Sequence, residues 1–221
     1  MTGFALSGAA YAVQSDATAE PRPSSTAIDP ALDRVPDNDQ GDQLVVLFGD
    51  SLTELAVADV RARFVADPER RLSAHYYGGT GFDTEAWLEK YPHVGEGSIV
   101  LVFLGINDVF DGTVAEAEQN ATGAIDTLTA AGADRVVVGT INTDGHAPQL
   151  GSDWGQRTQA FNEWLREADA DEFRYPALEL APWDLVSAGH SDWLKPDGVH
   201  LTVPGAAAYA EMIHDAARDV D

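Results

Sequence analysis

The sequence predicts an α/β fold: a three-layer α/β/α sandwich built around a parallel sheet of about five strands. First, short aliphatic runs such as LVVLF at residues 44–48 and SIVLVFL at residues 98–104 are typical of strands buried on both faces. Second, segments with helical periodicity separate these runs, and this alternation favours parallel strands joined by helical crossovers. Third, a length of 221 residues suits one such domain more easily than two.

The predicted elements follow one another in regular order after Gly41. We expect strands at residues 44–48, 72–77, 98–104, 135–141 and 173–180, of which the last has the weakest pattern. We expect helices at residues 55–65, 113–131, 154–168 and 204–218. The apolar residues of the first helix include Leu55, Phe64 and Val65, and Pro204 suits the first turn of the last helix.

Residues 1–41 differ in kind from the rest of the chain. They contain four prolines among many Ser, Thr, Ala and Asp residues and show neither a helical nor a strand period. We therefore expect a disordered leader or linker there and one folded domain over residues 42–221. Residues 4–13, FALSGAAYAV, resemble a truncated signal region, although no Lys or Arg precedes them. A secreted or cell-envelope location and a cytoplasmic one both stay open.

The charge balance of the chain excludes several classes of partner. The sequence holds 37 acidic residues against 13 Lys and Arg, a formal net charge of −24. Such a surface repels phosphate backbones and anionic lipid heads, so we expect no nucleic acid or membrane-surface partner. No apolar run approaches the about 20 residues that a membrane span needs. Two explanations of the acidity remain: a high-salt setting, in which screening relieves the repulsion, or an acidic bacterial protein kept soluble by its charge.

The chain contains no cysteine, which removes disulfides, thiolate catalysis and cysteine metal sites. Other chemistry is best sought where the strands end, because ligands of open parallel sheets bind beyond the carboxyl ends of the strands. That rule selects four short segments that follow predicted strands. They are Gly49–Thr53, Gly78–Thr84, Gly105–Asp108 and Asn142–His146.

Ser51 follows the first strand in the sequence FGDSL and stands where a helix begins. Gly49 would permit a tight turn, and the helix N-terminus would favour negative charge near the serine. A serine exposed there can attack an acyl carbon if a base takes its proton. Taken alone, Ser51 is better explained as the N-cap of the following helix.

Two further segments offer the missing groups. Asp197 and His200 lie three residues apart in a loop before the last helix, and an acid beside a histidine fixes the ring tautomer. A surface turn or a pair of metal ligands would explain the same spacing. Asn107 follows the strongest strand and could donate its amide to an oxyanion, or it could simply form an Asx-turn.

Together, four blocks resemble the SGNH (GDSL) hydrolase superfamily in their order and approximate spacing. The blocks are Gly49-Asp50-Ser51-Leu52, Gly78-Gly79-Thr80-Gly81, Gly105-x-Asn107-Asp108 and Asp197-x-x-His200. The resemblance covers the chain from about Leu44 onward and implies a flavodoxin-like sheet with no metal or organic cofactor.

The resemblance also implies a role for each matching residue. Ser51 would be the nucleophile, His200 the general base within hydrogen-bond reach of it, and Asp197 the residue that orients His200. The oxyanion hole would combine the Ser51 N–H, the Asn107 side chain and the N–H of Gly81, with Gly79 as the alternative donor. Asp50 would hold the turn through hydrogen bonds.

The resemblance implies a serine carboxylester hydrolase that works through an acyl-enzyme. A compact chain without a long apolar insertion favours short acyl groups, above all acetyl, and carbohydrate esters are one substrate class. Four aromatic residues near the sheet edge could stack on sugar rings or belong to the core: Trp87, Phe110, Trp154 and Trp183. The alternatives are an O-acyltransferase acting on a glycan, a receiver-like signalling module and a non-catalytic binding domain. The sequence does not predict the oligomeric state.

Overall fold

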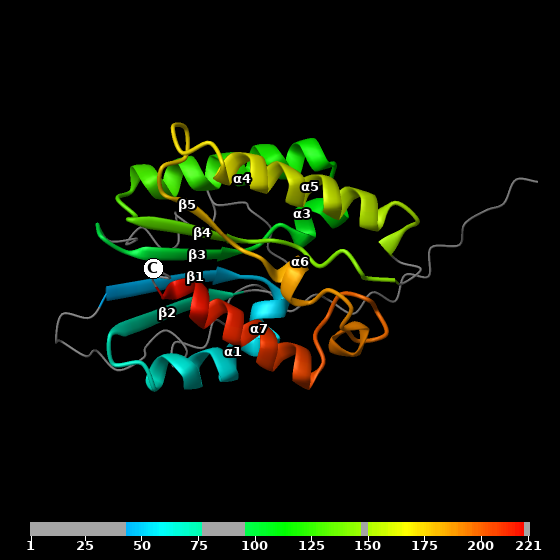
Figure 1. The fold of residues 1–221 in the computed structure, drawn as a ribbon, viewed down its shortest axis with the longest axis horizontal. Coiled ribbons are helices and arrows are strands. Elements are labelled where there is room, and N and C mark those ends of the chain that lie inside the picture. The colour runs from blue at the N-terminus through cyan, green and yellow to red at the C-terminus, as the bar shows by residue number, and fades with distance from the viewer. Residues whose placement is uncertain (1–42, 77–95, 147–149, 219–221) are drawn as a thin grey trace, which may run out of the picture.

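A computed structural model of the chain describes residues 43–76, 96–146 and 150–218 (Figure 1). Five strands form one all-parallel sheet in the order β2-β1-β3-β4-β5, which is the strand order of flavodoxin-like folds. The strands are β1 (Gln43–Gly49), β2 (Arg70–Tyr76), β3 (Ile99–Phe103), β4 (Arg135–Gly139) and β5 (Leu178–Ala181). The predicted fold class is therefore confirmed.

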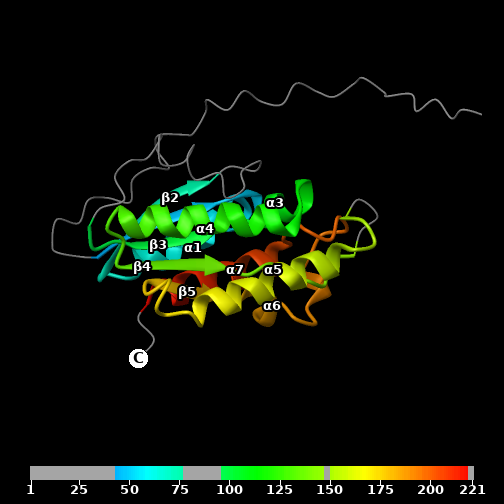
Figure 2. The same ribbon diagram turned by 90° about the horizontal axis from the view of Figure 1, so that it is seen from above.

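Helices cover both faces of this sheet, as Figure 1 and the turned view in Figure 2 show. Helices α1 and α7 pack together on one face, and α3, α4 and α5 pack on the other. Their bounds are α1 (Ser51–Val65), α3 (Ile106–Asp111), α4 (Val114–Ala130), α5 (Trp154–Asp169), α6 (Trp183–Val186), the 3-10 helix η2 (Ser191–Trp193) and α7 (Val203–Ala217). The arrangement is the predicted three-layer sandwich.

The register of the central strands determines which loops meet at the carboxyl edge of the sheet. Strand β3 is buried along its whole length, and the last five residues of β1 are buried as well. Gly49 at the end of β1 pairs with Phe103 at the end of β3. The turn into α1 and the turn into α3 therefore leave the sheet side by side.

Two predicted elements differ from those observed. The predicted strand over residues 173–180 is reduced to Leu178–Ala181, because the chain before it forms a turn in which Phe173 is fully exposed. In α1 the predicted apolar residues Leu55 and Val65 face solvent. The helix instead buries residues spaced four apart, namely Leu52, Ala56, Val60 and Phe64.

The short elements α3, α6 and η2 were not predicted. Helix α3 has six residues, α6 has four and η2 has three, so none is long enough to show a helical period in the sequence. Helix α3 matters most, because it carries Asn107 at the edge of the sheet.

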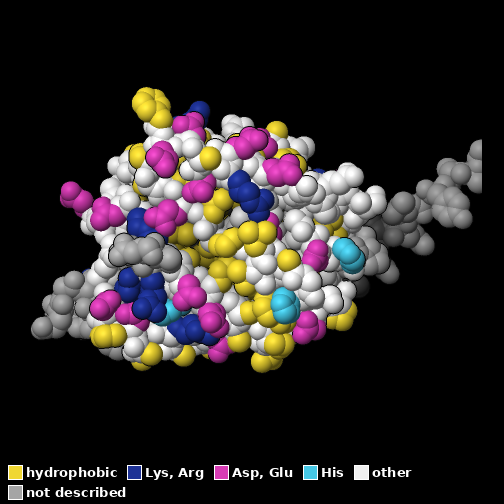
Figure 3. All heavy atoms as spheres, viewed as in Figure 1, with side chains coloured by type: hydrophobic (Ala, Val, Ile, Leu, Met, Phe, Trp, Pro, Cys, Tyr) yellow, Lys and Arg dark blue, Asp and Glu magenta, His cyan; other side chains and the backbone are white. Residues whose placement is uncertain are grey.

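Acidic side chains are spread over the face of the molecule in Figure 3, around an apolar depression between β5 and α7. Most of the ion pairs here use an arginine on a neighbouring carboxylate, as in Arg63 with Glu211 at 3.2 Å and Arg70 with Asp67 at 3.3 Å. With 37 acids and 13 Lys and Arg in the sequence, such pairs leave most of the carboxylates without a cation. The negative charge of the surface is therefore largely uncompensated.

Candidate active site

Asp50, rather than Ser51, caps helix α1. The Leu52 N–H donates to Asp50 Oδ1 over 2.9 Å, and Asp50 has the extended backbone of an N-cap residue. Ser51 is the first residue of the helix and is half-buried. The interpretation of Ser51 as a helix cap is therefore wrong, and its hydroxyl is left for another partner. The predicted structural role of Asp50 matches this hydrogen bond.

Gly49 is required at this junction for lack of space, not for an unusual backbone angle. It is absent from the described glycines with positive φ. A Cβ atom on Gly49 would lie 2.1 Å from Thr53 Oγ1, because the buried Thr53 of α1 packs directly against the end of β1. The expectation that glycine permits the turn holds, but the physical reason is the close approach of Thr53.

The loop with Asp197 and His200 is a tight turn stabilised by its own hydrogen bonds. Asp197 Oδ1 accepts from the N–H groups of Val199 and His200 at 3.0 and 2.9 Å. The second carboxylate oxygen, Oδ2, lies 2.9 Å from His200 Nδ1. Gly198 adopts a φ of 71°, in the left-handed region that favours glycine. The Asp197 carboxylate thus fixes both the backbone and the ring of His200.

The second ring nitrogen of His200 meets the start of α1. His200 Nε2 lies 3.1 Å from Ser51 Oγ, although 149 positions separate the two residues in the sequence. The predicted contact between Ser51 and His200 is present. Because both ring nitrogens are already engaged, one by Asp197 and one by Ser51, the alternative that Asp197 and His200 are a pair of metal ligands loses its support. In the ranges described, no cluster of three His, Cys, Asp or Glu side chains could hold a metal ion.

The two carboxylates of this region have opposite pKa shifts. Partial burial acts to raise the pKa of Asp197, but the N–H groups of Val199 and His200 and the His200 ring lower it overall, so this carboxylate stays charged. Burial raises the pKa of Asp50 to about 7 against its hydrogen bond from Leu52, and the charge of Asp108 adds to the rise. Asp50, the residue that precedes Ser51, is therefore neutral or half-ionised near pH 7.

Asn107 is the second residue of α3 and lies at the same carboxyl edge. Gly105 begins this helix with a φ of 100°, so the turn out of β3 needs glycine for its backbone angle. The helix is held from two sides: Asn120 Nδ2 donates to Asp108 Oδ1 over 2.9 Å, and the Arg157 guanidinium donates to the Val109 carbonyl. Asn107 thus lies on a short element that neighbouring helices fix in place.

Some predicted site residues are not brought together here. Gly79, Gly81 and Trp87 lie outside the described residues. Trp154 and Trp183 are almost fully buried, at 2% and 1% exposure. Of the two alternatives for these residues, the core is therefore correct, and neither offers a free ring face at the surface. Phe110 is partly exposed and meets the Trp154 ring edge-on at 6.3 Å.

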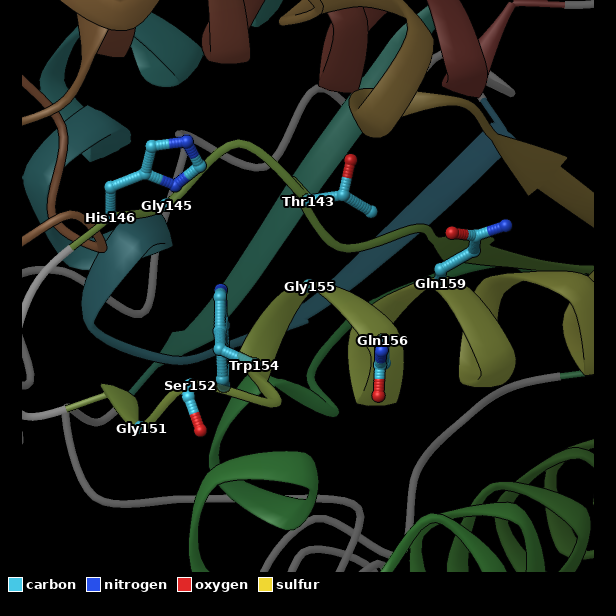
Figure 4. Close-up of a pocket in the computed structure, with 9 residues that line it drawn as sticks. All are labelled: Thr143, Gly145, His146, Gly151, Ser152, Trp154, Gly155, Gln156 and Gln159. Atoms are coloured by element: carbon cyan, nitrogen blue, oxygen red, sulfur yellow. The ribbon is translucent and has the colours of Figure 1, made fainter.

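Sequence reasoning gave no role to the residues that follow β4, although it placed Asn142–His146 at the sheet edge. Gly145 lies against Gly198 in the turn that contains Asp197. Thr143, Gly145 and His146 border a pocket of about 590 Å³ (Figure 4). Gly145, in a segment already placed beyond a strand end, was the one signal that could have drawn attention to them.

The chain matches a known protein family. The model of the GDSL-like lipase/acylhydrolase family matches residues 47–208. No curated protein sequence matches the chain. Among the described helices, none is both long and apolar enough to cross a membrane.

Solved structures with the same fold cover most of the chain at low sequence identity. A GDSL-like lipase from Bacteroides thetaiotaomicron has a TM-score of 0.65 at 17% identity, covering 79% of this chain and 87% of that one. A catalytic mutant of an acetylxylan esterase from Geobacillus stearothermophilus has a TM-score of 0.61 at 14% identity, covering 80% and 95%. The catalytic domain of peptidoglycan O-acetyltransferase A from Streptococcus pneumoniae has a TM-score of 0.57 at 18% identity, covering 79% and 92%.

Proposed function

Because the chain belongs to the GDSL-like lipase/acylhydrolase family, we propose that it hydrolyses carboxylic esters with Ser51 as nucleophile, His200 as general base and Asp197 as the residue that orients His200. The observation that carries this proposal is the continuous contact from Asp197 Oδ2 to His200 Nδ1 at 2.9 Å and from His200 Nε2 to Ser51 Oγ at 3.1 Å. Because the chain belongs to this family, its parallel sheet is that of a hydrolase and not that of a receiver-like signalling module.

The first half-reaction forms the acyl-enzyme. Ser51 Oγ attacks the carbonyl carbon of the ester while His200 Nε2 takes its proton. Asp197 accepts the Nδ1–H bond and stabilises the imidazolium that results. The tetrahedral intermediate then expels the alcohol, which receives the proton from Nε2. Water, activated by the same nitrogen, releases the acid in the second half-reaction.

The negative oxygen of the intermediate needs donors fixed in advance. We assign this role to the Ser51 N–H at the start of α1 and to the Asn107 side chain at the start of α3, with Gly81 as third donor. The pairing of Gly49 with Phe103 supports the first two, since it sets the two helix starts side by side. The N-terminus of α1, a 15-residue helix, adds a favourable field at the same place.

For the substrate we propose short acyl esters, above all acetyl esters of carbohydrates. The fold neighbours support this class, since they include an acetylxylan esterase and a peptidoglycan O-acetyltransferase. The second of these neighbours also supports the alternative of an O-acyltransferase. In that case a sugar hydroxyl would replace water in the second half-reaction, with the same three residues.

A panel of p-nitrophenyl esters of increasing chain length tests the proposal, with Ser51→Ala as the inactive variant. We expect the highest kcat/KM at acetate and a loss on the order of 10⁴-fold or more in Ser51→Ala. Ser152→Ala, which removes an exposed serine of the same sheet edge, is the matched control and should keep full activity. Undiminished hydrolysis by Ser51→Ala would refute the nucleophile, and a maximum at long chains would refute the short-acyl class. Product analysis with an added oligosaccharide acceptor separates hydrolysis from transfer.

A further inference from the structure

The segment that follows β4 contacts the chain leading to His200 at three successive points. We call residues 142–145 the β4 loop. Asn142 Nδ2 donates to Ser187 Oγ over 2.5 Å, and both side chains are buried. Asp144 Oδ2 accepts from the Gly189 N–H at 3.0 Å. The third contact is between Gly145 and Gly198, so the loop follows the 187–198 segment up to the turn that contains Asp197.

The contact between Gly145 and Gly198 leaves no room for a side chain. A Cβ atom on the buried Gly145 would lie 2.3 Å from the Gly198 carbonyl oxygen. It would also lie 3.1 Å from Trp154 Nε1 and 3.2 Å from a methyl group of Leu150, so it could not turn away from the carbonyl. Figure 4 shows the edge of the Trp154 ring directed toward the loop that contains Gly145. The obstacle is backbone on one side and a buried indole on the other.

Gly198 is a part of the turn that cannot move alone. Its N–H donates to the Lys195 carbonyl over 2.9 Å, and the Lys195 N–H donates to the His200 carbonyl over 2.7 Å. Asp197 Oδ1 binds the next two N–H groups, those of Val199 and His200. Because these bonds tie the turn together, a displaced Gly198 carbonyl would carry Asp197 and His200 with it.

We propose that Gly145 is a positioning residue for the general base: by lacking a side chain, it sets how far the Asp197–His200 turn lies from Ser51. This inference rests on the proposed ester hydrolysis and adds the loop after β4 to the machinery of that site. Cβ contacts under 3.0 Å essentially do not occur, so a methyl group at 2.3 Å requires a displacement of at least 0.7 Å (3.0 − 2.3). A misplacement of about 1 Å costs roughly 10²-fold in rate.

The test compares Gly145→Ala with Gly155→Ala. Gly155 borders the same pocket, but its Cβ would meet only the Thr143 carbonyl at 3.5 Å, an ordinary contact. We expect kcat for p-nitrophenyl acetate to fall about 10- to 100-fold in Gly145→Ala with KM little changed, and to stay at the wild-type value in Gly155→Ala. Each rate is expressed per active site titrated with a fluorophosphonate. A purely structural role would lower the titrated fraction and leave the rate per site unchanged, which would overturn the inference.

A second pair of variants tests the same loop without the clash. Asp144→Ala removes the acceptor for the Gly189 N–H, and Asp144→Asn keeps an oxygen there. We expect a several-fold loss of kcat per site in Asp144→Ala and recovery in Asp144→Asn. Equal rates in both variants would contradict the loop's role even if Gly145→Ala fails to fold.

A measurement independent of turnover separates this inference from the proposed function. The low-field proton NMR signal of His200 Nδ1–H, identified by its loss in His200→Gln, reports the bond to Asp197. We expect this signal to shift or broaden in Gly145→Ala and to stay in place in Gly155→Ala. An unchanged signal in Gly145→Ala would overturn the positioning role whatever the ester assays show. An inactive wild type with the expected shift would instead overturn the proposed function alone.

Discussion

Asp50→Asn should stabilise the protein at neutral pH, because Asp50 pays a large cost for ionising in the folded state. Asp50 is 2% exposed, and burial, with a contribution from the charge of Asp108, raises its pKa to about 7 from 3.8. The difference of about 3 pKa units corresponds to about 4 kcal/mol at 1.36 kcal/mol per unit. Asparagine keeps the cap of α1, since its amide oxygen can accept from the Leu52 N–H as Asp50 Oδ1 does.

The sign of the effect follows from proton linkage. Between pH 3.8 and about 7 the unfolded chain has lost the proton of Asp50 and the folded protein retains it. The stability that this difference contributes is therefore complete below about pH 4 and is lost as the pH rises to 7. The free energy of unfolding of Asp50→Asn should therefore equal that of wild type at about pH 4 and exceed it by roughly 2–4 kcal/mol at pH 8.

Urea unfolding of both proteins at pH 4, 5, 6, 7 and 8 measures this difference directly. Asp126→Asn, which removes an exposed carboxylate of α4, is the matched control for the loss of one negative charge. The free energy of unfolding of Asp126→Asn should change with pH nearly as that of wild type does. If the free energy of unfolding of Asp50→Asn also changes with pH as that of wild type does from pH 4 to 8, Asp50 ionises normally and the reasoning from its burial is wrong.

Three further predictions concern the site and the surface. Asn107→Ala should lower kcat about 10²–10³-fold with a small change in KM, as expected for the loss of an oxyanion donor; steady-state kinetics with an unchanged kcat would remove it from that role. Asp197→Asn should lower kcat by at least about 10²-fold while the melting temperature changes little; a wild-type rate would mean that His200 needs no orienting partner. For a chain of net charge −24, the free energy of unfolding should rise between 0.1 and 1 M NaCl, because screening relieves more repulsion than it costs in ion pairs; denaturation curves with no gain would leave the high-salt explanation without support.

The layer architecture could be predicted because it depends on hydrophobic patterns that are visible in the sequence alone. Strand β3 is buried along its full length and reads as an unbroken aliphatic run. Strand β5 did not follow this rule: only its first and last residues, Leu178 and Ala181, are buried, so its burial pattern is neither a continuous run nor an alternation. The apolar face of α1 was misjudged for a related reason. Its hydrophobic residues are spread around the whole helix, and only packing against α7 and the sheet decides which of them are buried.

Topology predicted that Ser51 and His200 lie at the same edge of the sheet, and the resemblance to the SGNH hydrolases implied their contact across 149 positions. Segments after parallel strands converge at one edge, and the last helix returns to it. The role of Asp50 as the cap could not be separated from that of Ser51 by sequence, since both residue types cap helices well. Their assignment depends on which backbone is extended, and the structure shows that this is Asp50.

The three glycines at this edge show where sequence reasoning reaches its limit. Gly49 makes room for Thr53, Gly105 provides a φ of 100°, and Gly145 makes room for the Gly198 carbonyl. All three are glycines in the sequence, but only Gly105 is needed for its own backbone angle. The other two depend on atoms that are distant in the chain or that lie one helical turn away. A glycine beyond a strand end is therefore weak grounds for a turn and better grounds for a close neighbour, and at Gly145 that neighbour is the turn that contains Asp197 and leads to His200.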